Sequence, residues 1–150
     1  MKNYTQLLLV FIAVSQSVNA DANTFCLRQD GAIQSQMRSV MINDLGVDAK
    51  SLDDKKTRLE LLSESKVSRV LAEQFAKKDL DKDKAKSDIF NLTWNDYLTT
   101  YTDDNVINLI IKYTFENKIG KKNVFIGSAI INDNECTVNT EGYVTVSREF

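Results

Sequence analysis

The chemistry open to this chain is limited first by the side chains that it lacks. Its 150 residues include no histidine, two cysteines and five glycines. Without histidine there is no Ser-His-Asp or Cys-His nucleophile and no histidine-ligated zinc or iron. The commonest general base near neutral pH is missing as well. No glycine loop of the G-x-G-x-x-G or Walker type occurs. These absences exclude most hydrolytic, redox and nucleotide-dependent reactions.

A pair of carboxylates, as in glycosidases, is the catalytic option that remains. Such a site needs acidic residues among apolar neighbours that raise a pKa. Asp96, Glu116 and Glu135 are the candidates with such neighbours. Each has a simpler interpretation, as a helix cap or as the solvent-facing residue of an alternating strand. We therefore expect no catalytic residue, no cofactor and no enzymatic activity.

Three aspartates resemble part of a calcium-binding loop. Asp79, Asp81 and Asp83 would occupy the first, third and fifth positions of an EF-hand. In that motif the sixth position is glycine and the twelfth is a bidentate glutamate, whereas Lys84 and Phe90 stand there in this chain. The lysines of the same run offset the charge that a cation would need. We predict no metal site and interpret the run as a solvated helix end or linker.

Aromatic residues are the strongest candidates for a binding surface. Trp94, Tyr97 and Tyr101 recur at helical spacing. The alternative is that this spacing marks the buried face of a helix that packs on a sheet. If one ring is exposed as a partner-binding anchor, we expect it to be Tyr101, beside a polar turn, and we expect Trp94 to be buried. The edge of the C-terminal sheet is the next candidate.

The first 20 residues have the pattern of a secretory signal peptide. Lys2 gives the positive start, residues 7–14 form an unbroken apolar stretch, and residues 18–20 match a small-x-small cleavage site. The apolar stretch is shorter than the roughly 20 residues of a membrane span. We expect cleavage before Asp21, a single globular domain over residues 21–150, and export as a released protein without a membrane span.

The two cysteines, Cys26 and Cys136, both lie in the predicted mature chain. An exported protein passes through an oxidising compartment, so a disulfide between them is the default interpretation. An enzymatic thiol pair would usually have close spacing such as C-x-x-C, which neither cysteine has. We predict a structural bond that ties the N-terminal helix to a C-terminal sheet.

Hydrophobic spacing predicts helices before residue 102. One runs from Ile33 to Leu45, with Gly46 in the left-handed conformation after it. A short helix over residues 52–62 follows an N-cap at Ser51, with acidic residues in its first turn. A third helix begins at Ser63 or Ser65 and continues through Phe75. A fourth begins near Thr93, where Thr93 and Asp96 form a capping box.

Strands are predicted for the rest of the chain. Residues 107–115 alternate between large apolar and mostly polar side chains, which favours a strand over a helix across residues 104–118. Two further strands are expected, over residues 124–131 and over residues 136–138 with 143–146, separated by turns at 132–134 and 139–142. The predicted fold class is α+β, with N-terminal helices packed on a C-terminal antiparallel β-meander and stapled by one disulfide.

The net charge of −2 becomes −3 when Lys2 is removed, and acidic and basic residues are interleaved. The charge therefore gives no basis for binding nucleic acid or an anionic membrane. The remaining class is an exported, disulfide-stapled domain that acts by binding another protein. An exposed sheet edge that could add a partner strand would favour assembly, and an acidic protruding loop would favour inhibition of an enzyme.

The signal sequence ending at residues 18–20, the mature size, the Cys26 and Cys136 pair and the composition rich in Asn, Lys, Asp and Ile carry a resemblance. The chain resembles the small periplasmic proteins encoded in type IVb pilus operons of the toxin-coregulated pilus kind. The resemblance implies a periplasmic accessory protein for pilus biogenesis or for secretion through the pilus apparatus. It assigns no functional residue. The alternative is a periplasmic inhibitor or immunity protein that blocks a secreted or resident enzyme.

Overall fold

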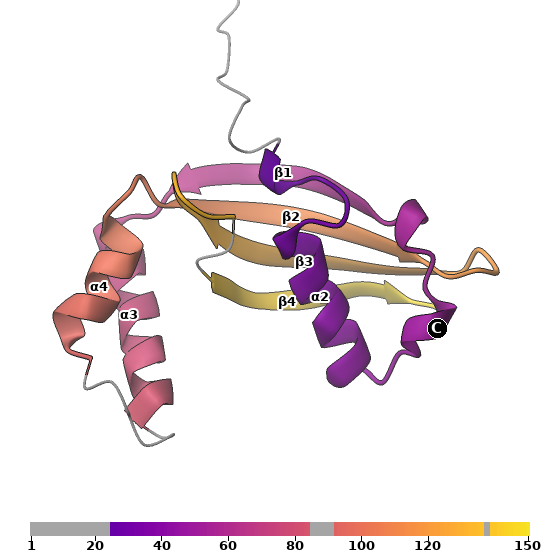
Figure 1. Ribbon diagram of the computed structural model, residues 1–150, viewed down its shortest axis with the longest axis horizontal. Helices are drawn as coiled ribbons and strands as arrows, with labels where there is room; N and C mark the ends of the chain where they lie inside the picture. The colour runs from indigo at the N-terminus through magenta and orange to yellow at the C-terminus, as the bar shows by residue number, and fades with distance from the viewer. Residues whose placement is uncertain (1–24, 85–91, 137–138) are drawn as a thin grey trace, which may run out of the picture.

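A computed structural model describes residues 25–84, 92–136 and 139–150, so the predicted signal peptide lies outside the described residues. The fold is α+β (Figure 1). Its helices are α2 (Ala32–Asn43), α3 (Arg69–Lys84) and α4 (Trp94–Thr102), and short 3-10 turns cover Ala49–Ser51 and Asp54–Lys56. Its strands are β1 (Arg58–Lys66), β2 (Ile107–Glu116), β3 (Lys122–Ile131) and β4 (Asn139–Arg148).

The four strands form one antiparallel sheet in the order β1-β2-β3-β4, which confirms the predicted meander. β2 and β3 pair without interruption from Ile107 opposite Ile131 to Glu116 opposite Lys122. The strand interpretation of residues 107–115 is correct because alternate side chains of β2 are buried. A helix would have placed this alternating set on both sides of its axis.

The main core lies between α2 and one surface of the sheet, which we call the inner surface. Ile33 and Met41 of α2 are fully buried there against residues such as Ile111 of β2. The predicted first helix is thus confirmed, although it ends at Asn43. Gly46 has a φ of 69°, the left-handed conformation predicted for it.

The predicted helix over residues 52–62 is wrong, because residues 58–62 belong to β1 and residues 54–56 form a 3-10 turn. Leu59 and Leu61 pack on the main core, at the period of a strand. β1 pairs with β2 over its length, with a register shift at Leu62. Backbone pairing with a neighbouring strand outweighs the helical propensity of leucine and glutamate, which is a fraction of a kcal/mol per residue. The next helix consequently starts at Arg69, after Ser63 and Ser65.

α3 and α4 form a helical hairpin between β1 and β2 in the chain, and they lie together at one end of the sheet (Figure 1). They enclose a second core, which contains Phe75, Tyr97 and Tyr101 and includes Ile130 of β3. Ile130 and Ile131 are consecutive in β3, so their side chains point to opposite surfaces of the sheet, and Ile131 belongs to the main core. The hairpin therefore covers one end of the outer surface of the sheet, the surface opposite α2.

The predicted turn at residues 139–142 is wrong, because β4 already begins at Asn139. The pairing of β3 with β4 shifts register between Gly127 and Ala129, and Gly142 has a φ of 94°. An irregularity within the strand, where glycine adopts a conformation that other residues avoid, absorbs the turn residues. Residues 137–138 of the predicted third strand lie outside the described residues.

The disulfide between Cys26 and Cys136 is present, across a sequence separation of 110 residues. Cys26 is buried in the main core and Cys136 packs against the edge of that core. The bond therefore fixes the chain just before α2 to the segment that follows β3, as predicted.

We expect the double variant Cys26→Ser, Cys136→Ser to be less stable than the wild type by about 4 to 5 kcal/mol, because a loop of this length is then no longer closed in the unfolded chain. Urea unfolding of both proteins measures the difference. Reductant should lower the melting temperature of the wild type and leave that of the double variant unchanged. Titration of two free thiols in the unreduced, folded wild type would contradict the prediction.

Candidate protein-binding surface

The aromatic residues of α4 lie differently from the sequence-based expectation. Tyr101 is 1% exposed and Tyr97 is 7% exposed, whereas Trp94 is 41% exposed. The expectation of a buried Trp94 and an exposed Tyr101 is therefore wrong in both parts. α4 returns toward the sheet, so Tyr101 lies against Phe75 at the sheet end of the hairpin, with the ring centroids 5.3 Å apart. Trp94 is the first residue of α4, at the far end.

The hydroxyl groups of both tyrosines bind to the acidic run of α3. Tyr97 donates a hydrogen bond of 2.8 Å to Asp83, and Tyr101 donates one to Asp79. The two tyrosines are four residues apart on α4, and the two aspartates are four residues apart on α3. The two hydrogen bonds therefore connect successive turns of the antiparallel helices. Asp81 faces elsewhere and pairs with Lys77 at 2.7 Å. The aspartates with calcium-like spacing thus lie within a helix, in agreement with the helix-end interpretation. Residues 85–88 of the charged run lie outside the described residues.

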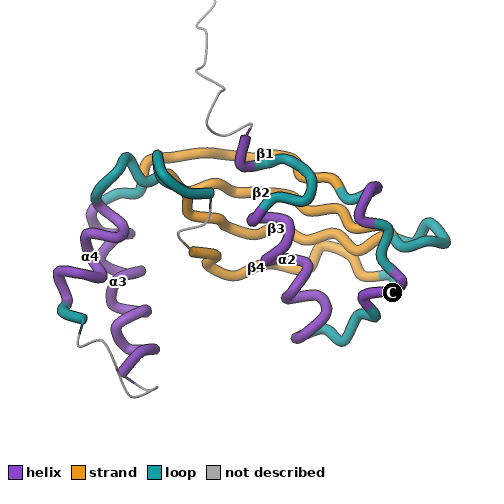
Figure 2. Tube along the Cα trace, in the orientation of Figure 1, coloured by secondary structure: helices purple, strands orange, loops and turns teal. Residues whose placement is uncertain are grey.

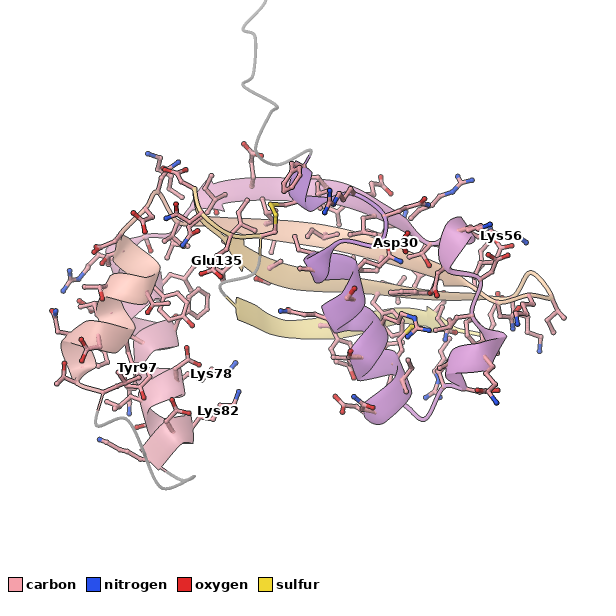
Figure 3. The ribbon with its side chains drawn as sticks, in the orientation of Figure 1. Asp30, Lys56, Lys78, Lys82, Tyr97 and Glu135 are labelled. Carbon is pink, nitrogen blue, oxygen red and sulfur yellow. A yellow bond between two sulfur atoms is a disulfide. The ribbon has the colours of Figure 1, made fainter. Side chains whose placement is uncertain are left out.

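The three candidate carboxylates do not converge on one site. Asp96 completes the predicted capping box of α4, and the hydroxyl and amide of Thr93, both 2.7 Å away, hold the pKa of Asp96 below its usual range. A general acid needs the opposite shift. Glu116 binds Lys56 at 3.0 Å. Glu135 lies in the loop after β3, at the opposite end of the sheet from Glu116 (Figure 3).

A set of apolar side chains, three of them exposed and three half-buried, lies instead on the outer surface of the sheet. We call it the open apolar face: Leu62, Ile110, Val124, Ile126, Val144 and Val146. Val144 pairs directly with Ile126, and Val144 and Val146 are 67% and 56% exposed. An antiparallel sheet with one surface on a core normally turns polar side chains to water on the other. Six aliphatic residues on that surface depart from this pattern.

Charged residues border this face where β1, β2 and β3 meet the 3-10 turns. They line a cleft of about 380 Å³ that contains four cations and two carboxylates: Lys56, Arg58, Lys112, Lys122, Glu60 and Glu116. Lys112 binds Glu60 at 3.0 Å, and Lys122 lies 4.0 Å from Glu116. Exposed ion pairs of this kind contribute little to stability. The border thus carries an excess of positive charge on a chain whose net charge is negative.

The sequence contains a signal for the open apolar face. Val124, Phe125 and Ile126 are consecutive apolar residues of β3, and Ile110 interrupts the polar positions of β2. Apolar residues at both parities indicate that both surfaces of a strand meet apolar material. The spacing of residues 143–146 predicts a strand, but the sheet surface that Val144 occupies depends on the register with β3.

A comparison of the chain with protein-family models finds no match, and neither the curated proteins nor the solved structures contain a significant match. Within residues 25–84, 92–136 and 139–150, no group of three or more acidic or cysteine side chains is placed to hold a metal ion. No helix in the same ranges combines the length and the apolar character of a membrane span.

We expect Tyr101→Ala to destabilise the protein by about 3 to 5 kcal/mol, as for other large buried rings, and Trp94→Ala by no more than about 1 kcal/mol. Tyr101→Phe keeps the ring but loses the hydrogen bond to Asp79, at a cost of about 1 to 3 kcal/mol. Urea unfolding of the three variants gives the order. Equal losses for Tyr101→Ala and Trp94→Ala would contradict the reversed burial.

Proposed function

We propose that this protein is exported and acts by binding another protein through the open apolar face. The observation that supports this proposal is the solvent exposure of Leu62, Val144 and Val146, on a sheet surface where Ile126 and Ile110 continue the apolar area. Exposed β-branched and leucine side chains next to charged groups form the apolar centre and polar rim of a protein interface. The proposed activity is binding without catalysis.

The border of the face indicates the chemistry of the partner. Lys56, Arg58, Lys112 and Lys122 outnumber Glu60 and Glu116 there. A partner that fits has an apolar patch fringed by carboxylates, because complementary charges speed association and disfavour wrong partners. The open apolar face supplies the desolvated centre, and the lysines supply the rim.

We propose an accessory role in assembling a pilus or secretion machine of the cell envelope, in line with the family resemblance. One feature weighs against the alternative of an inhibitor with an acidic protruding loop. The turn between β2 and β3, which projects beyond the sheet in Figure 2, carries Lys118 and Lys121 around Ile119, which is 78% exposed. A basic loop of this kind does not match an acidic plug for a basic catalytic cleft.

Export is the first testable part of this proposal. We expect the mature protein to begin at Asp21 and to be recovered from the periplasm or the medium, because residues 1–20 carry the signal pattern and the disulfide forms in oxidising compartments. Cell fractionation followed by N-terminal sequencing measures both. Recovery of the chain from the cytoplasm with residues 1–20 intact would contradict it.

The binding surface is tested with Val144→Asp and a matched control. Val70 lies on α3 and is 67% exposed, as Val144 is, so Val70→Asp introduces the same charge at the same exposure elsewhere. Both variants should keep the melting temperature within a few degrees, since exposed substitutions cost about 0.5 kcal/mol. Only Val144→Asp should abolish the assembly activity in the cell and the loss should exceed tenfold, because a charge is then buried in the interface.

A photo-crosslinking amino acid at position 144 or at position 70 identifies the contact directly. We expect a discrete cross-linked product with an envelope protein from position 144 and none from position 70. A product that contains only a second copy of this chain would replace the proposed partner with self-association. Equal products from both positions, or full activity of Val144→Asp, would remove the open apolar face as the binding surface.

A further inference from the structure

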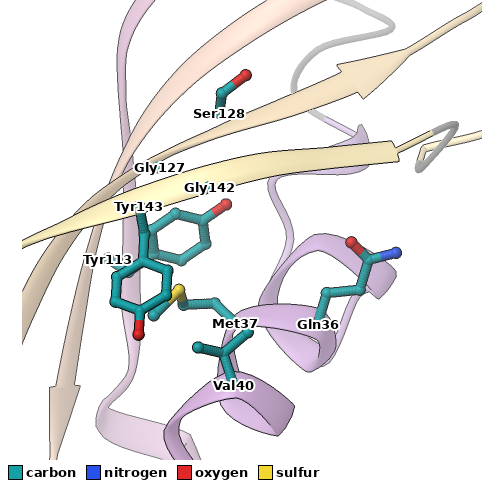
Figure 4. A pocket seen from close by; sticks show the side chains of 8 residues that line it. All are labelled: Gln36, Met37, Val40, Tyr113, Gly127, Ser128, Gly142 and Tyr143. Carbon is teal, nitrogen blue, oxygen red and sulfur yellow. The ribbon is translucent and has the colours of Figure 1, made fainter. Parts of the chain in front are cut away.

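A cavity under α2 and the turn between β2 and β3 both lie outside the open apolar face. The cavity measures about 200 Å³ and lies on the inner surface of the sheet. Figure 4 shows Met37 and Val40 of α2 beside the rings of Tyr113 and Tyr143, and none of the lining residues is charged. Such walls select no chemical class of ligand. The turn, in contrast, combines an exposed apolar side chain with cations.

Hydrogen bonds hold the apex of this turn in one conformation. The amide of Gly120 donates a hydrogen bond of 3.0 Å to the carbonyl oxygen of Asn117, so Lys118 and Ile119 are the central residues of a β-turn. The side-chain oxygen of Asn117, a residue only 5% exposed, accepts from two further amides of the turn at 3.1 and 2.9 Å. The amide of Lys118 also donates to the carbonyl oxygen of Ser51. Binding at this apex would therefore cost little loop ordering.

The apex presents an aliphatic side chain among lysines. Ile119 is 78% exposed, although turns favour glycine, asparagine, aspartate and serine, and isoleucine adds nothing to the turn itself. Lys118 and Lys121 are exposed on either side of it, and no carboxylate among the described residues pairs with them. A single exposed aliphatic residue is common on protein surfaces. Here, however, it is fixed at the end of the molecule and surrounded by positive charge.

Charge is also segregated along the sheet. Residues 116–122, at the turn end of the ladder between β2 and β3, include three lysines and one glutamate. Residues 92–106 and 131–136, at the other end, include five carboxylates and no lysine or arginine. Figure 3 shows Glu135 and Lys56 at these opposite ends. A chain with this distribution approaches an anionic surface with the turn first, even though its net charge is negative.

We propose that the turn between β2 and β3 contacts an anionic lipid bilayer, with Ile119 inserted among the headgroups and Lys118, Lys121 and Lys122 close to the lipid phosphates. Protein interfaces are depleted of lysine and enriched in aromatic residues and arginine, and residues 117–122 contain neither of the enriched kinds. At a bilayer surface, lysines attract anionic lipids while they stay hydrated, and an aliphatic side chain enters the acyl boundary. The contact is weak and reversible, and it leaves the open apolar face accessible to a protein partner.

Co-sedimentation of the purified mature protein with lipid vesicles measures this contact. Vesicles of phosphatidylcholine with phosphatidylglycerol should bind the protein, vesicles of phosphatidylcholine alone should bind it much less, and added salt should release it. Lys118→Gln combined with Lys121→Gln should weaken binding about 25-fold, because each lysine at an anionic surface contributes roughly fivefold. Ile119→Ser should weaken it about tenfold, through the loss of a buried aliphatic side chain.

Matched variants on α3 remove the same kinds of group elsewhere. Lys82→Gln combined with Lys84→Gln removes two exposed lysines, and Val70→Ser removes an aliphatic side chain that is 67% exposed. Both should bind the vesicles nearly as the wild type does. Val144→Asp should do so as well, because the open apolar face takes no part in this contact. Melting temperatures establish that each variant is folded.

Equal binding of the wild type to both kinds of vesicle, or unchanged binding in the folded turn variants, would overturn the proposal. Equal weakening by the α3 variants would overturn it too, because the attraction would then not belong to the turn. If the wild type binds neither vesicle and Ile119→Ser loses assembly activity in the cell, a protein replaces the bilayer as the partner of the turn. None of these results depends on Val144, so the proposed protein-binding function keeps its own experiment.

Discussion

The ladder between β2 and β3 runs without a register shift from Ile107 opposite Ile131 to Glu116 opposite Lys122, and every other element is attached to it. α2 packs on its inner surface, and the α3–α4 hairpin reaches its outer surface through Ile130. β1 and β4 pair with its two sides. A slip of one residue would exchange the two surfaces of β2 and bury Lys112 in place of Ile111. The uninterrupted register is therefore the constraint that fixes both cores.

The same ladder creates the open apolar face. Because apolar residues occupy both parities of β3, a register that buries Phe125 necessarily turns Val124 and Ile126 outward. The α3–α4 hairpin covers only the end of this surface near Ile130. The rest lies beside Val144 and Val146, which are more than half exposed. Burying the inner surface and exposing the outer one are thus two consequences of one sequence pattern.

Prediction from the sequence succeeded where one period dominates a segment. α2, β2 and β3 follow from the spacing of Ile33 and Met37 and from the alternation after Ile107, and the capping box at Thr93 places the start of α4. For β1 the local pattern predicts a helix, because Ser51 resembles an N-cap before leucine-rich residues. What decides its state is pairing with β2, about 50 residues later in the chain, which no local pattern contains.

The candidate site was harder to predict because exposure depends on tertiary position. Trp94, Tyr97 and Tyr101 lie on one face of the helix, so their spacing alone predicts the same burial for all three. Their exposed fractions differ because α4 approaches the sheet at Tyr101 and leaves it at Trp94. The hydrogen bonds from Tyr97 to Asp83 and from Tyr101 to Asp79 likewise need both helices in place, so the sequence showed the aspartates only as a charged run.

The two edge strands bear on how this sheet can bind a protein. A sheet can add a partner strand at an edge, or it can pack one surface against a partner. β1 shifts register at Leu62, and β4 shifts register twice against β3, once at Val146. Such irregularities twist an edge away from regular pairing and are a common defence against strand addition. The edges are therefore poor templates, whereas Val144 and Ile126 present side chains across the strands. Packing of a partner on the outer surface satisfies the exposed apolar groups without requiring either irregular edge to pair.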